Sequence, residues 1–315
     1  MNRLRALLRE DTAGDPMGRQ GLWTGKRLRD ISRELGQLGL RVCPNTVRRL
    51  LDEVDYALHA NRKSLCANDS PFRDQQFDYL NHHRKEFAAS GYPIISVDTK
   101  KKELVGQFKN NGRVWSRDPV LVQDHDFRSQ AQGIAIPYGI YDIQANRGMV
   151  VVGNSHDTPD FAVEAIGQWW RRDGSRRYPD TPELLILADS GGSNGARCRA
   201  WKLALQEKLV DRYQVSVTVC HYPSGASKWN PIEHRLFSEI SKHWGGQPLS
   251  DYETIVRLIG GTRTQTGLVV NCALNTKHYP TKVPIAKQQM DELDLLKHPV
   301  LPDWNYTLLP RQIRN

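Results

Sequence analysis

The chain has 315 residues, of which 39% are hydrophobic and 25% are charged, an ordinary balance for a soluble protein of more than one domain. Its five cysteines are scattered, odd in number and without a Cys-x-x-Cys pair, which argues against a disulfide framework or a zinc ribbon and favours a reducing cytoplasm. The N-terminus has no signal peptide, the apolar runs are far too short to span a membrane, and the net charge of +9 favours a polyanionic partner such as nucleic acid.

The first part of the chain predicts a small all-α helix-turn-helix domain over residues 1–66. Apolar residues recur at helical spacing in residues 26–38 and again, beyond a glycine, in residues 44–54. Arg48 and Arg49 lie off the second apolar stripe, where they could meet a DNA groove or a phosphate. This region also holds 13 Lys and Arg against 8 Asp and Glu, so we expect it to bind DNA. Two solvated helices of a small bundle would give the same pattern.

The rest of the chain alternates between strand-like and helical patterns, which predicts an α/β fold with a mixed sheet and helices on both faces. The expected strands are residues 94–98, 134–143, 148–153, 184–188 and 215–220, and the expected helices are residues 72–87, 160–172, 194–209 and a helix that begins near Pro231. We expect a linker helix in residues 67–93 and a main domain in residues 94–265, with a polar insertion at about 103–130. Residues 266–315 carry many prolines and threonines without periodicity and are expected to be a C-terminal extension.

Two aspartates each end an apolar run that is typical of a strand buried on both faces. Asp98 ends the run in residues 94–97, and Asp189 ends the run in residues 184–188. If these strands are parallel neighbours, their C-terminal ends lie side by side, as do the two acids. Two close carboxylates repel each other unless a cation neutralises them, and oxygen ligands suit magnesium. Each aspartate alone could also be a turn former or a helix cap.

A third acid has an equally specific position. Pro231 favours a helix start, and Leu236, Phe237 and Ile240 stand three, four and seven residues after Glu233. Glu233 therefore lies on the core-facing stripe, where an acid is costly without a partner, so we expect it to point at a metal or another cation. A glutamate in a first helical turn can also simply complement the helix dipole.

Three acids that hold two divalent ions fit one definite chemistry. One ion lowers the pKa of a water or a 3′-hydroxyl, and the other stabilises the departing oxygen of an in-line displacement at phosphorus. Lysines beside the acids would hold DNA phosphates, although each could belong to an ordinary solvated charge run. The candidates are Lys100, Lys101, Lys102 and Lys228.

Five stretches stand out as long motifs. They are residues 96–106 (SVDTKKKELVG), 135–142 (AIPYGIYD), 189–195 (DSGGSNG), 227–237 (SKWNPIEHRLF) and 303–311 (DWNYTLLPR). Together they resemble the bacterial insertion-sequence transposases of the ISAzo-thirteen type, which belong to the DDE superfamily. The resemblance runs over nearly the whole chain.

The resemblance implies a ribonuclease-H-like catalytic domain in residues 94–265, in which the first and fourth strands are adjacent and parallel. It implies two magnesium or manganese ions per active site, held by Asp98, Asp189 and Glu233, and cleavage and joining of DNA strands at the element's ends. The implied partners are double-stranded DNA, as terminal repeats and as target, and further copies of the chain on that DNA. We expect a nucleoid-associated cytoplasmic protein without membrane contact. Members of this family carry further N-terminal DNA-binding sequence, so we expect a shortened copy.

Two other functions fit parts of the sequence. A DNA-binding regulator, or an inactive remnant of a transposase, would keep the basic N-terminal region without catalysis. A serine hydrolase is suggested by Gly-x-Ser-x-Gly around Ser193, with Asp251 and His278 in suitable order. Against the hydrolase, Ser193 lies too far beyond its strand for a tight nucleophile elbow, and Asp98 and Glu233 would have no role.

Overall fold

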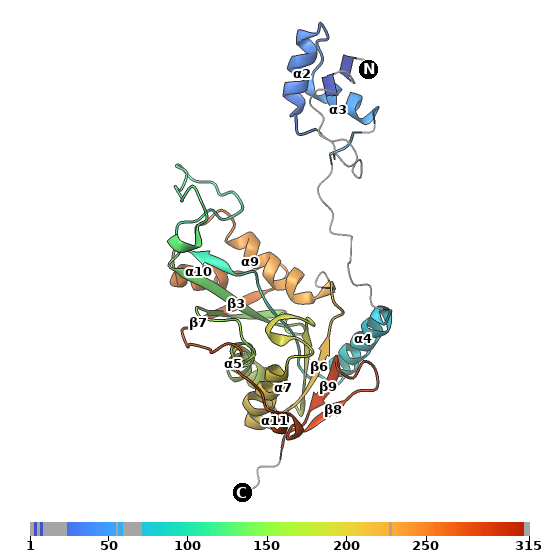
Figure 1. Cartoon of the computed structure of the whole chain (residues 1–315), viewed down its shortest axis with the longest axis vertical. Coiled ribbons are helices and arrows are strands. Elements are labelled where there is room, and N and C mark those ends of the chain that lie inside the picture. The colour runs from blue at the N-terminus through green and yellow to red at the C-terminus, as the bar shows by residue number, and fades with distance from the viewer. Residues whose placement is uncertain are drawn as a thin grey trace. The chain divides into compact units, whose positions relative to one another are not determined.

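The structure, a computed structural model, describes residues 3–4, 7–8, 24–54, 56–58, 71–226 and 229–311 (Figure 1). The chain divides into two compact units, Met1–Leu65 and Cys66–Asn315. None of the helices in the described ranges combines the length and the apolar character that crossing a membrane requires.

The N-terminal unit contains two short helices, α2 (Leu28–Gln37) and α3 (Pro44–Asp52), where the apolar spacing predicts them. Pro44 stands in the first turn of α3, where its missing N–H costs no helical hydrogen bond. The two helices bury Ile31, Leu35 and Val47 in a small apolar cluster of their own. Each helix thus depends on tertiary packing, as short helices do.

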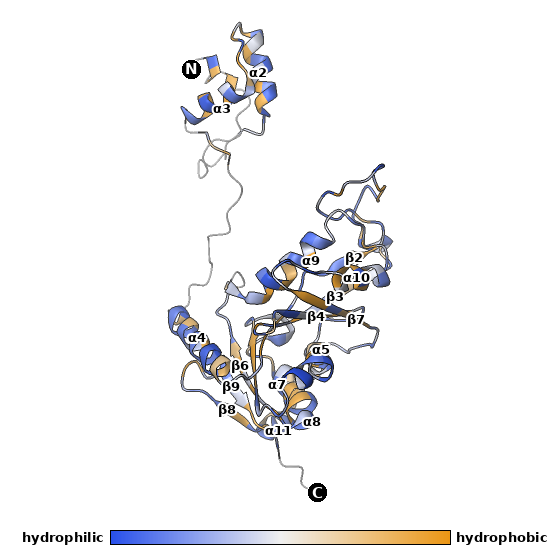
Figure 2. Cartoon of the chain, turned by 180° about the vertical axis from the view of Figure 1, so that it is seen from behind, coloured by the Kyte–Doolittle hydropathy of each residue, from blue (hydrophilic) through white to orange (hydrophobic). Residues whose placement is uncertain are grey.

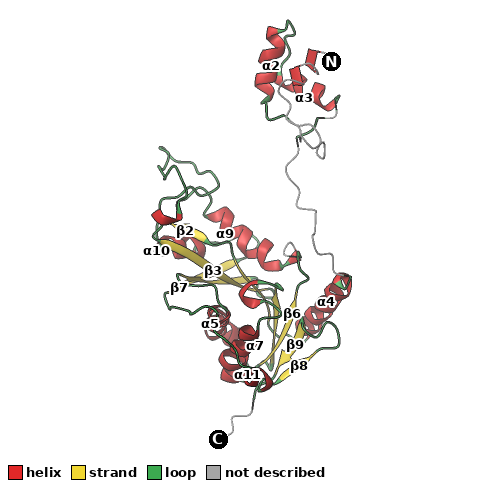
Figure 3. Ribbon diagram, viewed as in Figure 1, coloured by secondary structure: helices red, strands yellow, loops and turns green. Residues whose placement is uncertain are grey.

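The C-terminal unit is built on one nine-stranded sheet (Figure 3). Its central strands are β1 (Ile94–Thr99), β3 (Gly133–Asp142), β4 (Arg147–Gly153), β5 (Glu183–Ala188) and β6 (Ser216–His221), in the spatial order β4-β3-β1-β5-β6. β3 is antiparallel to both of its neighbours here, whereas β5 pairs in parallel with β1 and β6. The first and fourth of these five strands are therefore adjacent and parallel, which confirms the expected ribonuclease-H-like mixed sheet.

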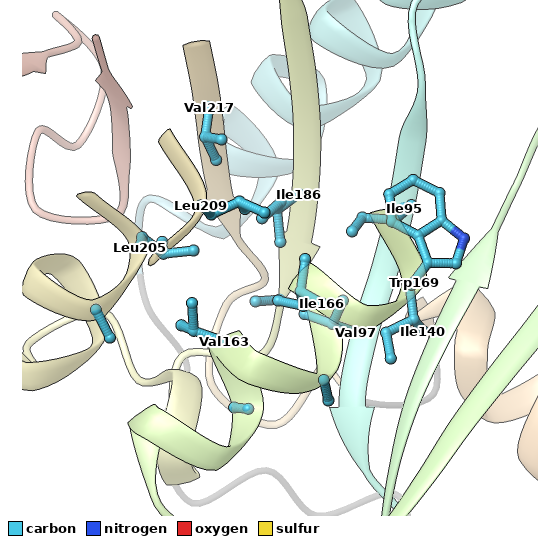
Figure 4. Close-up of a cluster of buried hydrophobic side chains, with 14 of the residues drawn as sticks. Ile95, Val97, Ile140, Val163, Ile166, Trp169, Ile186, Leu205, Leu209 and Val217 are labelled. Carbon is cyan, nitrogen blue, oxygen red and sulfur yellow. The ribbon is translucent and has the colours of Figure 1, made fainter. Parts of the chain in front are cut away.

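One face of the sheet is covered by α5 (Pro159–Trp169), α7 (Arg199–Leu205) and the π-helical segment η4 (Gln206–Val210). Every second residue of the central strands points into this layer. Figure 4 shows Ile95, Val97 and Ile186 from the strands in one cluster with Ile166 and Trp169 of α5. Because burying one such side chain contributes about 1.5–3 kcal/mol, this layer is a main source of the unit's stability.

The opposite face carries helices as well, and Figure 2 shows apolar residues along the strands between the two layers. The π-helical segment η6 (Glu233–Phe237) continues into α9 (Ser238–His243), and both pack near β3 and β4 together with α10 (Tyr252–Gly260). The sequence pattern did not predict α10. Helices on both faces confirm the expected layer arrangement.

Helix α4 (Arg73–Ala89) lies on this second face, beside β1, β5 and β6. It buries Leu80 and Phe87, and its buried Gln76 donates 2.8 Å hydrogen bonds to the His221 carbonyl and to Asn305 Oδ1. The expected linker helix is therefore part of the covering layer of the sheet. The pattern missed this because the face of α4 toward the sheet includes a polar glutamine among few apolar residues.

The last part of the chain adds three strands, β7 (Val269–Asn275), β8 (Leu295–Lys297) and β9 (Asn305–Leu308), and the short helix α11 (Lys287–Asp291). β7 pairs in parallel with β4, and β9 pairs antiparallel with β6 and β8. The expectation of an aperiodic extension in residues 266–315 is therefore wrong. β7 and β8 are half-exposed edge strands and β9 is four residues long, so none shows a clear period of two.

The insertion at about 103–130 contains one short strand, β2 (Glu103–Val105), which pairs with β3, and one turn of 3₁₀ helix, η1 (Arg128–Gln130). Residues 111–121 are all exposed. The helix expected at residues 194–209 begins later, at Arg199, because the glycine-rich turn continues through a 3₁₀ turn, η3 (Gly192–Asn194).

Candidate catalytic site

Asp98 and Asp189 lie side by side at the C-terminal edge of the parallel pair β1 and β5. The two strands are in register with Val97 opposite Ala188, so the next residue of each is an aspartate. Val97 and Ala188 point into the α5 layer, and strand alternation turns both aspartates to the other face. The neighbour relation that the sequence reasoning had to assume is therefore present.

The surroundings of these two carboxyls disfavour negative charge. Burial and the nearby Asp189 raise the pKa of Asp98 to about 8, against a 2.7 Å hydrogen bond from the Thr99 N–H, and Glu233 raises this pKa further. Burial also raises the pKa of Asp189, although the Asn230 amide donates to Asp189 Oδ1 at 3.0 Å. A cation between the two carboxyls would remove this repulsion.

Glu233 approaches the aspartates from the helix that crosses the same face. Leu236 and Phe237, in the following turn, are buried against β3 and β4, while Glu233 itself is half-buried. Its charge acts on the pKa of both Asp98 and Lys100. Leu236, Phe237 and Ile240 of the predicted stripe are therefore buried, and the role of Glu233 as the third acid of the site stays a prediction.

Gly139 lets this helix come close to the sheet. It pairs with Asp98 across β1 and β3, and a Cβ on Gly139 would lie 2.5 Å from Phe237 Cε1 and 3.0 Å from Ile232 Cδ1. Real Cβ atoms do not approach other atoms so closely, so only glycine fits this position with the helix in place. Sequence reasoning missed Gly139, although a glycine inside a strand is a signal of close backbone approach.

The donor set of the three acids suits a hard divalent cation. All three offer carboxylate oxygens. Asp98 and Asp189 are half-buried neighbours, and the groups that donate hydrogen bonds to them, the Thr99 N–H and the Asn230 amide, are neutral. In the described part of the chain, no three His, Cys, Asp or Glu side chains are grouped closely enough to hold a metal ion. The carboxylate oxygens of the three acids fit magnesium or manganese by their chemistry.

A fourth acid, Asp157, belongs to the same cavity. Its Oδ1 accepts a 3.2 Å hydrogen bond from the Thr99 hydroxyl, and its Oδ2 lies 3.4 Å from Lys102 Nζ. Its charge also raises the pKa of Asp98. Asp157 follows β4 in the chain. Because β3 is antiparallel to both β1 and β4, the C-terminal end of β4 lies at the same edge of the sheet as those of β1 and β5.

A cavity with a volume of about 540 Å³ and a basic rim lies beside Asp98 and Asp189, and Glu233 is not among the residues that line it. It is lined by Asp98, Thr99, Lys100, Lys101, Lys102, Asp157, Asp189, Ser190, Gly191, Gly192, Ser193, Asn194, Pro223, Ser224 and Gly225. A Cβ on Gly191 or Gly192 would meet nothing within 4 Å, so the turn after Asp189 leaves open space on that side.

The predicted DNA-binding residues differ in their surroundings. Lys101 and Lys102 are exposed on the cavity rim, and Lys228 lies outside the described residues. Lys100 is buried, with Nζ 3.2 Å from Glu103 Oε1 and 4.5 Å from the centre of the Trp244 ring, and burial lowers its pKa. Lys100 lines the same cavity, but its ammonium group is paired with Glu103 and is less accessible to DNA than those of Lys101 and Lys102.

In the N-terminal unit, Arg48 and Arg49 are both exposed on α3, as the apolar stripe predicts. The Nε atom of Arg49 lies 4.0 Å from Glu53 Oε1, which is a weak surface pair. Both guanidinium groups can therefore reach a polyanion.

Ser193, Asp251 and His278 do not form a catalytic triad. Ser193 is buried and its hydroxyl donates to Asn194 Oδ1 at 3.3 Å. Asp251 caps α10 by accepting a 2.6 Å hydrogen bond from the Thr254 N–H, and the ring of His278 packs 5.5 Å from that of His156. Nothing in this geometry favours the serine hydrolase.

His221 and Asn230 both contact Asp189 through polar atoms. His221 is fully buried, with Nδ1 3.0 Å from the Asp189 carbonyl oxygen and Nε2 3.3 Å from the Tyr306 hydroxyl. Asn230 is also buried and accepts a short hydrogen bond from the Ser96 hydroxyl while it donates to Asp189. The carboxyl and the backbone of Asp189 are therefore both held in place.

Neutral His221 should make the folding stability depend on pH. Burial lowers the pKa of His221 to about 4, so between pH 6.5 and 4 the unfolded state binds more protons than the folded state. The contribution of neutral His221 to the free energy of unfolding is complete above pH 6.5 and is lost as the pH falls toward 4. The total loss is roughly 3 kcal/mol, since one pKa unit corresponds to about 1.4 kcal/mol. Urea unfolding between pH 4 and 7.5 measures it.

The informative quantity is the difference between the wild type and His221→Gln, because the raised pKa values of Asp98 and Asp189 give slopes of the opposite sign in both proteins. The variant should lack the loss of stability on acidification. An identical pH dependence in the two proteins would contradict the buried neutral state of His221.

Comparison with known proteins adds three findings. A family model described as "Rhodopirellula transposase DDE domain" matches residues 3–310. No curated protein matches the chain. Among solved structures, the Mos1 transposase paired-end complex with left transposon end matches with 14% identity and a TM-score of 0.44, over 81% of this chain and 68% of that one. The Mos1 Strand Transfer Complex matches with 15% identity and a TM-score of 0.43, over 81% and 67%.

Proposed function

Because the chain belongs to the DDE transposase family, which it matches over residues 3–310, we propose that Asp98, Asp189 and Glu233 cut and join DNA strands at the ends of an insertion sequence. The chain is thus a transposase, a polynucleotidyl transferase by reaction class. One observation supports the residue assignment above the others: two half-buried aspartates stand at adjacent strand ends, and the charges of Asp189 and Glu233 both raise the pKa of Asp98.

The three acids would hold two magnesium or manganese ions, which supply an activated water or 3′-hydroxyl and stabilise the departing oxygen of an in-line displacement. Asp98, whose pKa of about 8 favours the protonated form at neutral pH, would release its proton as the cation binds. Asn230 orients the Asp189 carboxyl through its 3.0 Å hydrogen bond. The charge of Glu233 raises the pKa of Lys100, although the ammonium group of Lys100 pairs with Glu103.

Exposed cations would hold the DNA. Lys101 and Lys102 line the rim of the cavity, where a scissile phosphate has to lie. Arg48 and Arg49 of α3 would contact the terminal repeats, in line with the helix-turn-helix interpretation of residues 1–66. Lys228 would be a further contact to DNA phosphates, because it lies in the same motif as Glu233, five residues before it.

We also propose that copies of the chain assemble on DNA. An insertion sequence has two ends, and each chain carries one set of acids, so two ends cut in one complex require two chains. Such a protein acts on the chromosome and would be found with the nucleoid.

The proposed reaction is tested by strand cleavage of a labelled duplex that carries the element's own ends. With MgCl₂ or MnCl₂ we expect cleavage at the end of the element and, with a target plasmid present, joined products. With EDTA we expect neither, because the buried acids cannot orient the nucleophile alone.

The regulator or inactive remnant makes a different prediction for the same assay. Binding of the end duplex without cleavage in either metal would favour that alternative. Cleavage that persists in EDTA would refute the use of divalent ions.

A further inference from the structure

A second basic cavity lies on the other face of the sheet, along α5. Its volume is about 420 Å³, and we call it the α5 groove. It is lined by Val163, Glu164, Gly167, Gln168, Arg171, Lys208, Arg212, Asn275 and Lys277. These residues come from α5, the π-helical segment η2 (Trp170–Gly174), η4, α8 (Asp211–Tyr213), the end of β7 and the residues after it. None of them lines the catalytic cavity.

Positive charge in this groove exceeds negative charge. Lys208 and Lys277 both pair with Glu164, at 3.2 Å and 2.6 Å, and Lys208 also lies 3.0 Å from Asp160. Glu164 Oε2 in addition accepts a 2.7 Å hydrogen bond from the Tyr279 hydroxyl. The lysines therefore already use the carboxylates of the groove, and the two arginines have no share in them.

Arg171 and Arg212 both contact Tyr213, and each keeps further N–H groups that can donate hydrogen bonds to a ligand. Arg171 Nη1 donates to the Tyr213 hydroxyl at 2.8 Å, and the Arg212 guanidinium carbon lies 5.7 Å from the centre of the Tyr213 ring. Among the described residues, neither guanidinium has a carboxylate within 4.0 Å. Two oriented guanidinium groups without a counter-ion are the arrangement that binds phosphate oxygens.

Gly167 also lines the groove, and the absence of a side chain there leaves space beside Arg171. A glycine inside a helix costs about 1 kcal/mol relative to alanine. No packing requires it, since a Cβ here would find only ordinary contacts, 3.7 Å from the Tyr213 hydroxyl and 4.0 Å from Arg171 Nη1. Its effect is to leave the floor of the groove open beside these two polar groups.

We propose that the α5 groove binds the sugar-phosphate backbone of duplex DNA, at a second contact away from the catalytic cavity. The proposal rests on the transposase function and adds where such DNA lies. An extended polyanion fits better than a small phosphate, because Arg172 and Arg176, outside the groove but within five residues of Arg171 in the chain, are exposed as well. The groove offers charge without base-reading geometry, so the contact is independent of DNA sequence.

The test measures binding of the full chain to a 40-base-pair duplex without element ends, in EDTA, by fluorescence anisotropy between about 50 and 200 mM NaCl. Arg171→Ala combined with Arg212→Ala should weaken binding about tenfold and reduce the slope of log affinity against log salt by about 1 to 2, roughly 0.9 for each lost phosphate contact. Glu164→Gln should tighten binding, because it removes negative charge from the groove.

The matched control is Lys85→Ala combined with Arg257→Ala, which removes the same charge from exposed positions of α4 and α10 on the opposite face. It should change the affinity less than twofold. Arg171→Lys with Arg212→Lys keeps the charge and should keep most of the affinity, which separates charge from folding.

Unchanged affinity in the alanine pair, or an equal loss in the control pair, would overturn the proposal. It would also fall if the alanine pair lost binding of inorganic pyrophosphate in calorimetry but kept the duplex. Cleavage of a short duplex with element ends, at saturating concentration, should be unchanged in the alanine pair. That readout belongs to the catalytic acids, so the two proposals can fail separately.

Discussion

Replacing Asp189 by asparagine is expected to lower strand cleavage by about 1000-fold or more, while the melting temperature stays the same or rises. The carboxyl of Asp189 is half-buried and stands beside Asp98, so removing part of its charge from water destabilises the folded state. An amide of equal size removes that cost together with one of the oxygens that a metal ion needs. Asp98→Asn and Glu233→Gln should lose cleavage to a similar extent. Cleavage rates and thermal unfolding of the purified variants measure both effects.

Two other acids provide matched controls. Asp142 is an aspartate at a strand end that is more deeply buried than Asp189, with a pKa raised by burial, but its carboxyl accepts hydrogen bonds from the Tyr178 hydroxyl at the opposite edge of the sheet. Glu239 lies one to two turns beyond Glu233 and pairs with Lys242 at 2.6 Å. Asp142→Asn and Glu239→Gln should keep cleavage. Wild-type rates in all three catalytic variants would refute the assignment.

A loss confined to Asp189→Asn, with full activity in Asp98→Asn, would return attention to the serine hydrolase alternative around Ser193. A loss in Asp142→Asn as large as in Asp189→Asn would mean that these substitutions act through folding. Thermal unfolding of the same samples separates the two cases.

Gly139→Ala is expected to lower cleavage by about 100-fold and to destabilise the fold by about 1–3 kcal/mol, the range for an overpacked core. The added methyl would lie 2.5 Å from Phe237 Cε1 and 3.0 Å from Ile232 Cδ1. The helix must then move away from the sheet, and Glu233 moves with it. Cleavage rates and urea unfolding of the variant test this prediction.

Gly260→Ala is the control for Gly139→Ala, because its Cβ would meet Cys272 Cβ at an ordinary 3.6 Å. It should leave cleavage and stability near their wild-type values. Adding Phe237→Leu to Gly139→Ala shortens the side chain that clashes and should restore part of the activity. Wild-type cleavage by Gly139→Ala alone would show that close packing of this helix is not needed to place Glu233.

The sequence by itself determined most of the local elements and led to the proposal of Asp98, Asp189 and Glu233 as the three acids. Runs such as residues 184–188 are apolar because the strand is buried on both faces. Burial on both faces can therefore be predicted from consecutive residues alone. The position of Glu233 follows from helical spacing to Leu236 and Phe237 within two turns. The family resemblance rests on motifs of the same local kind.

Only the tertiary structure decided which elements meet. The pairing of β1 with β5, the proximity of Gly139 to Phe237 and the packing of α4 join segments far apart in the chain. The strands at the C-terminus depend on partners that cover their edges, and the α5 groove collects cations from three separate segments. Burial of Lys100 likewise depends on Trp244. Periodicity reports which face of an element is apolar, because that depends on neighbours within a few residues, whereas strand order depends on contacts between distant residues.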